Sequence, residues 1–190
     1  MWLALWPAPM LWLLLGAKIN FKNLFMIKLK PFRETPGLCG PASLKIVMDY
    51  YGVSVSEADI AKIAGATQEK GVSVAGLIKA ARHFGFKVLV KENSSLDDLS
   101  YYVKKEIPVI VDWFSEDDGH FSVVADIDKN NVILMDPAIR KFLIYIRRRK
   151  FPRETFLRIW FDFPGDYIKT SKNLVLRLMI AVLPKYAGKL

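Results

Sequence analysis

The chain has 190 residues, which is enough for one domain with a hydrophobic core and too few for two domains of ordinary size. Apolar residues make up 52% and charged residues 25%, a composition that excludes a largely disordered chain. The net charge of +9 is confined to the last third, because residues 139–190 carry a net +10 and residues 1–138 a net −1.

The first 17 residues contain no charged side chain, and Lys18 and Lys22 follow them. This length is at the bottom of the range for a membrane-spanning helix, and two prolines interrupt the run. The apolar segment 1–25 is therefore interpreted as a membrane anchor or as an extension ahead of a natural start at Met26, with other packing as a third possibility. For an anchor, the lysines favour a domain on the cytoplasmic side of the membrane. Otherwise we expect a cytoplasmic protein.

Three helices are expected in a row in the first half of the chain. The first follows Pro41, with apolar side chains at helical spacing at Leu44, Val47, Met48 and Tyr51. Ser56 and Ser73 are suited to cap the next two, which we expect to end near Gly65 and Gly85.

Predicted strands dominate the second half of the chain. We predict a helix at 96–104 and strands at 86–90, 107–113, 121–127, 132–135 and 142–146. Runs of helices followed by runs of strands are typical of the α+β class. The phosphate-binding pattern GxxxxGK[ST] does not occur, so no ATPase is predicted.

The end of the chain, 166–190, is predicted to be a basic amphipathic tail that follows a catalytic domain at 26–165. Its apolar run at 174–184 contains Arg177 and is too short to cross a membrane. A helix packed on the domain is the favoured interpretation, and a helix lying on anionic lipid is the alternative.

Basic residues cluster ahead of this tail, at Arg147, Arg148, Arg149 and Lys150. Such a run usually forms a solvated face, and contact with an anionic membrane surface is a second interpretation. A nucleic-acid partner is not expected, because enzymes that act on nucleic acids spread positive charge around their site. The chain up to residue 138 is slightly acidic instead.

Cys39 is the only cysteine, so no intramolecular disulfide can form. A single cysteine is often a small buried apolar side chain, and such a residue would lie within the apolar stripe of its helix. Cys39 instead precedes Pro41, at the predicted N-terminus of the first helix, where the helix dipole favours a thiolate. We therefore predict that Cys39 is a nucleophile.

A thiol nucleophile needs a base, and the chain offers only His83 and His120. His83 falls in the last turn of a predicted amphipathic helix, where a solvated role is expected. His120 follows Gly119 at the start of a predicted strand. Asp136 ends the next strand, and a hairpin would bring its carboxylate near His120, where it would fix the tautomer and stabilise the imidazolium. Two separated histidines and one cysteine show no metal-ligand spacing, so no metal and no cofactor is predicted.

Three stretches resemble the C39 peptidases and their C39-like relatives, which are papain-like cysteine peptidases: LCGPASL at 38–44, GHFSVVADID at 119–128 and MDPA at 135–138. They occur in the family's order, and the resemblance runs from about Lys30 to Trp160. It implies a papain-like α+β fold, with N-terminal helices packed on an antiparallel sheet. It also implies hydrolysis of a peptide or protein substrate through an acyl-thioenzyme, by Cys39, His120 and Asp136. The best-known members remove leader peptides after a double glycine and are fused to an ABC transporter, a fusion not predicted here, so that substrate is not inferred.

One departure from the family concerns the oxyanion. The family usually has a glutamine a few residues before the cysteine, which donates a hydrogen bond to the oxyanion, but this sequence has RETPG there. The corresponding position falls on Glu34 or Arg33. Losing one such donor typically costs about 10²–10³ in rate. Four interpretations stay open. Either Glu34 is protonated, Arg33 substitutes for the glutamine, the amide of Cys39 is the sole oxyanion donor, or catalysis is impaired. The alternative function is therefore a catalytically impaired domain that binds a peptide or a partner protein.

Overall fold

The computed structural model describes residues 26–116, 118–138, 148–163, 165 and 167–185. Three helices come first in the chain and a fourth follows one strand later: α1 (Cys39–Tyr50), α2 (Glu57–Ala64), α3 (Val74–His83) and α4 (Leu96–Lys104). The longer strands are β1 (Phe86–Lys91), β2 (Val109–Ser115), β3 (Asp118–Ile127), β4 (Asn131–Met135), β5 (Arg148–Pro152) and β8 (Met179–Pro184). The remaining elements are α5 (Arg153–Ile159), β6 (Phe161–Asp162), the 3-10 turn η2 (Ser171–Asn173) and β7 (Val175–Leu176).

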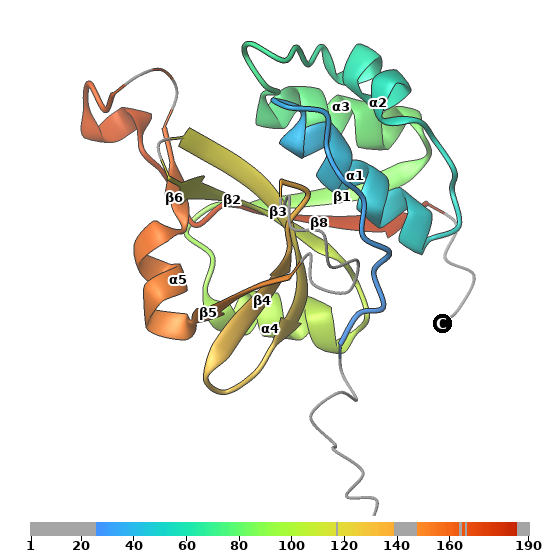
Figure 1. Cartoon of the computed structure of the whole chain (residues 1–190). Coiled ribbons are helices and arrows are strands. Elements are labelled where there is room, and N and C mark those ends of the chain that lie inside the picture. Colours follow the sequence, from blue (N-terminus) through green and yellow to red (C-terminus); the bar gives the residue numbers. More distant parts are fainter. Residues whose placement is uncertain (1–25, 117, 139–147, 164, 166, 186–190) are drawn as a thin grey trace, which may run out of the picture.

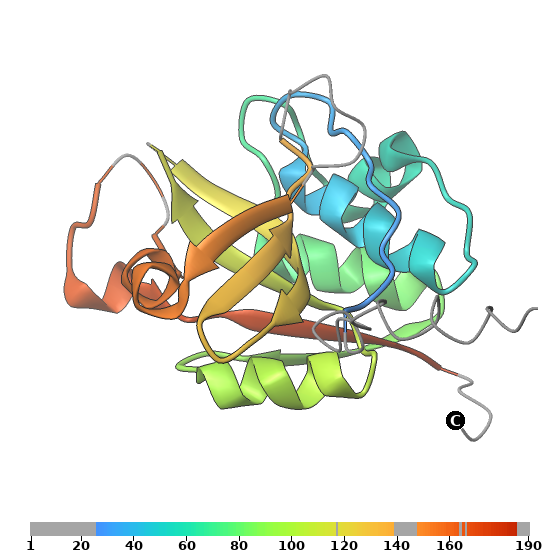
Figure 2. The same ribbon diagram turned by 60° about the horizontal axis from the view of Figure 1, so that its bottom comes forward.

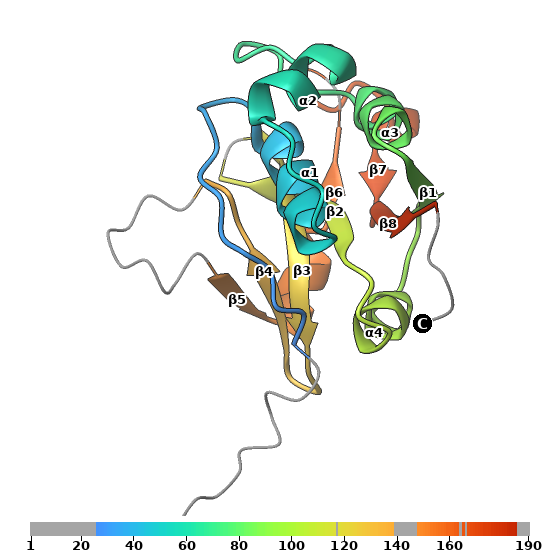
Figure 3. The same ribbon diagram turned by 90° about the vertical axis from the view of Figure 1, so that its right-hand side faces the viewer.

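The long strands form one antiparallel sheet in the order β1-β8-β2-β3-β4-β5 (Figure 1). Helix α1 packs on β3, and α2 and α3 pack beside α1, so the first three helices form one group (Figure 3). Helix α4 contacts β2 and β3 and lies across β8 from that group (Figure 2). The predicted α+β fold, with N-terminal helices packed on an antiparallel sheet, is confirmed.

Local signals account for the helices. The side chains of Ser56 and Ser73 accept hydrogen bonds from Asp59 N and Gly76 N and so cap α2 and α3. Both caps were predicted from the sequence. The cap of α4 is reciprocal, because Ser95 and Asp98 each bond the other's backbone N–H.

The core lies between the helix group and the sheet. Buried side chains of α1 meet buried side chains of the central strands, among them Leu44, Val47, Met48, Val109, Val111, Val123 and Val182. This packing fixes α1 against β3, and Ser43 adds a buried hydrogen bond from its hydroxyl to Phe121 O at 3.0 Å. The N-terminus of α1 is thereby held beside the first residues of β3.

The helix expected at 174–184 is wrong. This segment forms β7 and β8, and β8 pairs with β1 on one side and β2 on the other. Met179 to Val182 are buried in the middle of the sheet. A short continuous apolar run fits a strand that is covered on both faces, and the left-handed backbone of Arg177, with φ of 49°, separates the two strands. Part of the expected tail 166–190 is therefore a central strand of the domain.

Two predictions concern residues outside the described part of the chain, the apolar segment 1–25 and the strand at 142–146. Among the described residues, no helix is long and apolar enough to cross a membrane. The described part of the basic run belongs to β5, the edge strand that pairs with β4, where Lys150 is exposed and Arg148 and Arg149 are half-buried.

Candidate active site

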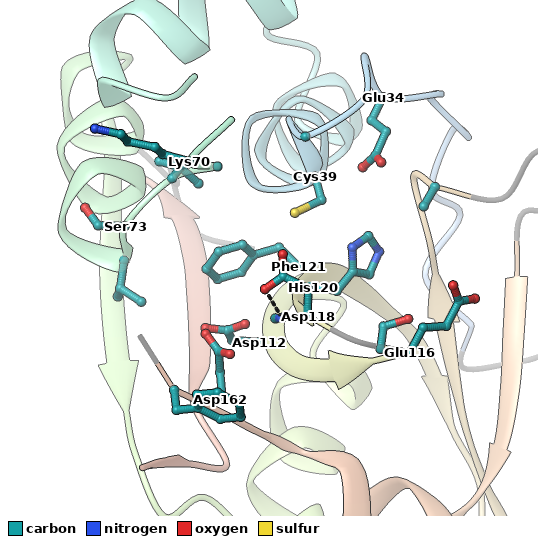
Figure 4. A pocket seen from close by; sticks show the side chains of 18 of the residues that line it. Glu34, Cys39, Lys70, Ser73, Asp112, Glu116, Asp118, His120, Phe121 and Asp162 are labelled. Carbon is teal, nitrogen blue, oxygen red and sulfur yellow. Dashed lines mark hydrogen bonds between the residues drawn. The ribbon is translucent and has the colours of Figure 1, made fainter. Parts of the chain in front are cut away.

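Cys39 is the first residue of α1, as its flanking sequence predicted. The turn before it depends on Gly37, whose φ is +80° and whose missing Cβ would lie 2.1 Å from Gln68 O. Only glycine fits this turn without displacing the neighbouring backbone. The sulfur therefore stands at the N-terminal end of α1 and points into an open pocket (Figure 4).

His120 and Asp136 meet across the β3–β4 hairpin. The distance from His120 Nε2 to Asp136 Oδ1 is 2.8 Å, and both residues are buried. The same Oδ1 accepts the N–H of Ala138 at 2.8 Å. Because Nε2 is committed to Asp136, Nδ1 is the ring nitrogen left to face Cys39, whose sulfur lies within 4.8 Å of the His120 ligand atom.

These contacts shift both ionisations. Burial by itself lowers the pKa of His120, but the hydrogen bond to Asp136 and the electrostatic interactions with Cys39 and Asp136 outweigh it and raise the pKa to about 10. Burial by itself raises the pKa of Asp136, but the hydrogen bond from His120 outweighs it, and Ala138 N and Arg149 add to the net lowering. An imidazolium next to an ionised carboxylate is therefore the favoured state near neutral pH.

Arg149 lies next to the second oxygen of Asp136. Its Nε forms an ion pair with Asp136 Oδ2, and its guanidinium lies 5.6 Å from the ring centre of Trp113. The Trp113 ring meets the His120 ring edge to face at 5.6 Å, and its indole N–H donates to Ser122 Oγ at 3.1 Å. Trp113 and Arg149 thus pack against the histidine–aspartate pair.

The structure distinguishes the two candidates for the oxyanion region. Glu34 lines the pocket that contains Cys39 and His120, whereas Arg33 lines a smaller neighbouring pocket. The backbone of Glu34 is anchored by its N–H, which donates to Pro137 O at 3.2 Å. The next residue, Thr35, donates its hydroxyl to Glu57 at 2.6 Å. Of the two side chains, the carboxyl of Glu34 is the one that faces the sulfur (Figure 4).

Two neighbouring carboxyls, Asp112 and Asp162, also line the pocket (Figure 4). Asp112 is 4% exposed, and its Oδ1 has no hydrogen-bond partner in the described part of the chain. Burial, followed by the charge of Asp162, raises the pKa of Asp112 well above its ordinary value. Burial and Asp118 also raise the pKa of Asp162. The two carboxyls therefore share a proton more readily than they ionise together.

Gly119 makes room for this pair beside the histidine. A Cβ there would lie 2.4 Å from Asp162 Oδ1, so a larger residue would have to displace this carboxyl. The whole pocket has a volume of 1310 Å³ and is open to solvent on one side, which is enough space for several residues of an extended peptide.

Sequence reasoning did not identify Arg149, Trp113, Asp112 or Asp162 as part of the site. Arg149 was placed in the basic run, and the two aspartates come from strands far apart in the chain. One signal was available, since Asp112 interrupts the apolar strand VIVDWF at a position that faces the core.

Comparison with known proteins places these features in a family. The model of the peptidase C39 family matches residues 35–162, a span that contains Cys39, His120 and Asp136. An uncharacterised protein of Methanothermobacter thermautotrophicus is 36% identical over 122 residues, which cover 64% of this chain and 75% of that protein.

Two solved structures share the fold. A C39-like peptidase from Bacillus anthracis has a TM-score of 0.62 at 17% identity, covering 83% of this chain and 96% of its own. A double glycine motif protease from an AMS/PCAT transporter, in complex with the leader peptide, has a TM-score of 0.60 at 22% identity, covering 84% of this chain and 94% of its own. These likenesses agree with the papain-like topology expected from the sequence.

Proposed function

This chain belongs to the peptidase C39 family, whose domains are cysteine peptidases, and from that premise we propose that it hydrolyses a peptide bond through an acyl-thioenzyme. The observation that carries the proposal is the position of His120, which hydrogen-bonds to Asp136 on one side and has a ring nitrogen within 4.8 Å of the Cys39 sulfur. In this proposal Cys39 is the nucleophile, His120 the base and then the acid, and Asp136 the group that orients the ring.

The steps follow from this geometry. The thiolate of Cys39 attacks the carbonyl carbon of the substrate, and the carbonyl electrons move to oxygen. As the intermediate collapses, the carbon–nitrogen bond breaks and His120 Nδ1–H donates its proton to the leaving amine. Water then attacks the thioester and gives a proton to Nδ1. Release of the acid product restores the thiolate and the imidazolium.

The oxyanion of the intermediate needs donors. The N–H of Cys39 is among the first N–H groups of α1, which have no acceptor within the helix. This N–H is therefore one donor in our proposal. An ionised Glu34 at the edge of the site would repel the oxyanion, so full activity requires that Glu34 be protonated or turned away.

Alkylation tests the activated thiol. Because Cys39 is the only cysteine, labelling of the full chain by iodoacetamide reports on this residue alone. We expect rapid labelling near neutral pH and much slower labelling of a His120→Ala variant, because the imidazolium that stabilises the thiolate is removed. His83→Ala, which changes the other histidine of the chain, is the matched control and should label like the unchanged chain. Equal rates in all three would refute the activated thiol.

The second candidate function is peptide or partner binding without turnover, and the placement of Glu34 favours it. Turnover of a peptide library by the unchanged chain and by Glu34→Gln separates the two functions. Activity that rises about 10²–10³-fold in the variant would show a peptidase limited by its oxyanion donors. Binding without turnover in both forms would establish the binding module.

The substrate class in this proposal is a peptide or protein. The leader-peptide complex of the similar transporter protease supports a peptide in the pocket, without indicating its sequence. Contact of the basic third with an anionic membrane stays a prediction, and Arg149 is withdrawn from that surface because it pairs with Asp136.

A further inference from the structure

Three side chains that converge at the Cys39 sulfur are of types that commonly bind metal ions. Glu34, Cys39 and His120 each offer one ligand atom, and these three atoms all lie within 4.8 Å of one another. They come from the loop before α1, from its first residue and from β3. Figure 4 shows the carboxyl, the thiol and the imidazole converging on one space.

The donor types match a borderline-soft divalent ion. Zinc binds thiolate, imidazole and carboxylate at about 2.0–2.3 Å, and a tetrahedral site therefore spaces its ligand atoms by about 3.3–3.8 Å. The three atoms here need to move by only about an ångström to reach that spacing. Three protein ligands with a fourth position left to water is a common zinc arrangement.

The histidine is already held as zinc ligands usually are. A histidine that binds a metal generally gives its other ring N–H to a carboxylate, which fixes the tautomer and the ring plane. Here Nε2 bonds to Asp136 at 2.8 Å, and Asp136 is held by Ala138 N and Arg149. Nδ1 is therefore the nitrogen presented to the metal.

Zinc binds the neutral ring, so His120 Nδ1 gives up its proton when the ion binds. The thiolate of Cys39 and the carboxylate of Glu34 are then the two anionic ligands. The loop is fixed in place by Glu34 N to Pro137 O at 3.2 Å and by Thr35 to Glu57, so the carboxyl stays near the sulfur.

We propose that Glu34, Cys39 and His120 form a three-ligand site for Zn²⁺, and that the bound ion prevents Cys39 from acting as a nucleophile. Zinc would thus hold the domain in a resting state until it is removed. Metal binding is measured without a peptide, so its failure is distinguishable from failure of the proposed peptidase activity.

Cobalt substitution of the full chain tests the site. Co²⁺ should produce a thiolate-to-cobalt charge-transfer band and the strong visible bands of tetrahedral coordination, and Zn²⁺ should displace it stoichiometrically. The same Zn²⁺ should protect Cys39 from iodoacetamide. Binding without the charge-transfer band, or without protection of Cys39, would overturn the proposal.

Glu34→Gln is the decisive variant, because it keeps the thiol and the histidine but removes the anionic carboxylate ligand. Loss of even an outer partner costs about 10–100-fold in metal affinity, so we expect Co²⁺ and Zn²⁺ to bind at least about tenfold more weakly. Glu92→Gln, an exposed glutamate after β1, should bind like the unchanged chain.

Cys39→Ser gives a second test that does not depend on the loop. This variant should lose the charge-transfer band while keeping the same circular dichroism spectrum.

Equal affinity in the unchanged chain and in Glu34→Gln would exclude Glu34 as a ligand and contradict the proposal.

Discussion

Asp136 and Asp112 are both buried near His120, at 0% and 4% exposure, but their surroundings differ. Asp136 follows β4 and meets the His120 ring, the N–H of Ala138 and Arg149, and its pKa is lowered. Asp112 lies on β2 among other carboxyls, with one oxygen unpartnered in the described part of the chain, and its pKa is raised. Similar burial therefore shifts the pKa values of the two aspartates in opposite directions, because their neighbouring side chains differ in charge.

The two aspartates have different roles near one histidine. The Asp136 side is a charged network that holds the histidine protonated and oriented, and it costs stability if any member is removed. The Asp112 side is a proton-sharing pair that opposes folding at neutral pH, because burial disfavours its charge. Variants on each side should therefore shift activity and stability in opposite patterns.

Asp136→Asn should produce the largest effect. The amide cannot stabilise the imidazolium and favours the wrong tautomer, so we expect peptide turnover to fall about 10³–10⁴-fold. Steady-state kinetics measure this loss. Asp126→Asn, a buried aspartate further along β3 whose carboxylate bonds Ile127 N, is the control and should change turnover little. A fall of less than tenfold in Asp136→Asn would show that Asp136 does not orient the base.

The same variant should move the titration of His120. In the unchanged chain the ring should titrate near pH 10, and in Asp136→Asn well below that, because burial then acts without its main opposing contact. Histidine ring resonances followed by NMR measure the midpoint. The folded chain keeps the His120 proton up to about pH 10, whereas the unfolded chain loses it above about pH 6.5. This proton therefore stabilises the fold fully below about pH 6.5, and its contribution to the free energy of unfolding declines as the pH rises toward 10. An unchanged midpoint in the variant would contradict the role of Asp136.

The parts of this molecule that could be predicted are those with local causes. The caps Ser56 and Ser73 and the apolar stripe of α1 lie within the segments they organise. The β3–β4 hairpin is also local, and it alone brings Asp136 to His120. The pairing of base and carboxylate therefore followed from a short-range pattern, whereas the approach of Cys39 to His120 depends on the packing of α1 on β3.

The parts that were missed depend on distant partners. Strand β8 is a strand because β1 and β2, about 70 or more residues earlier, pair with it, and no feature of its own run excludes a helix. Arg149 belongs to a basic run whose composition is typical of a surface, and only the pairing of β5 with β4 turns it toward Asp136. Asp112 and Asp162 likewise meet only because β2 and β6, which are far apart in the sequence, pack together.

Arg149→Met should have an intermediate effect, on stability. Breaking a buried ion pair costs about 3–5 kcal/mol because the remaining charge loses its partner. The Arg149 side chain is 31% exposed, and solvent screening reduces the expected loss to about 1–3 kcal/mol. Denaturant unfolding measures this loss, with the exposed Lys150→Met as control. Combined with Asp136→Asn, the loss should be smaller than the sum, and full additivity would show that the two residues are not coupled.

Asp112→Asn should produce the smallest effect, with the opposite sign. Asparagine has the same shape, carries no charge and can donate to Asp162, so we expect a gain of about 1–2 kcal/mol at pH 8. The folded chain keeps a proton on Asp112 that the unfolded chain releases above its ordinary pKa of 3.8, so the unchanged chain loses stability as pH rises from there. The advantage of the variant should therefore vanish below about pH 4. Thermal unfolding at pH 4 and pH 8 measures it.

Asp98→Asn is the matched control for the direction of this stability change. Asp98 is a carboxylate whose pKa is lowered to about 2 by hydrogen bonds from Lys91 and Ser95, so its replacement should decrease stability at pH 8. If Asp112→Asn also lowered stability at pH 8, Asp112 would have to be ionised and well partnered in the folded chain. The contrast between the Asp112 and Asp136 surroundings would then be lost, because both aspartates would carry full charge beside His120.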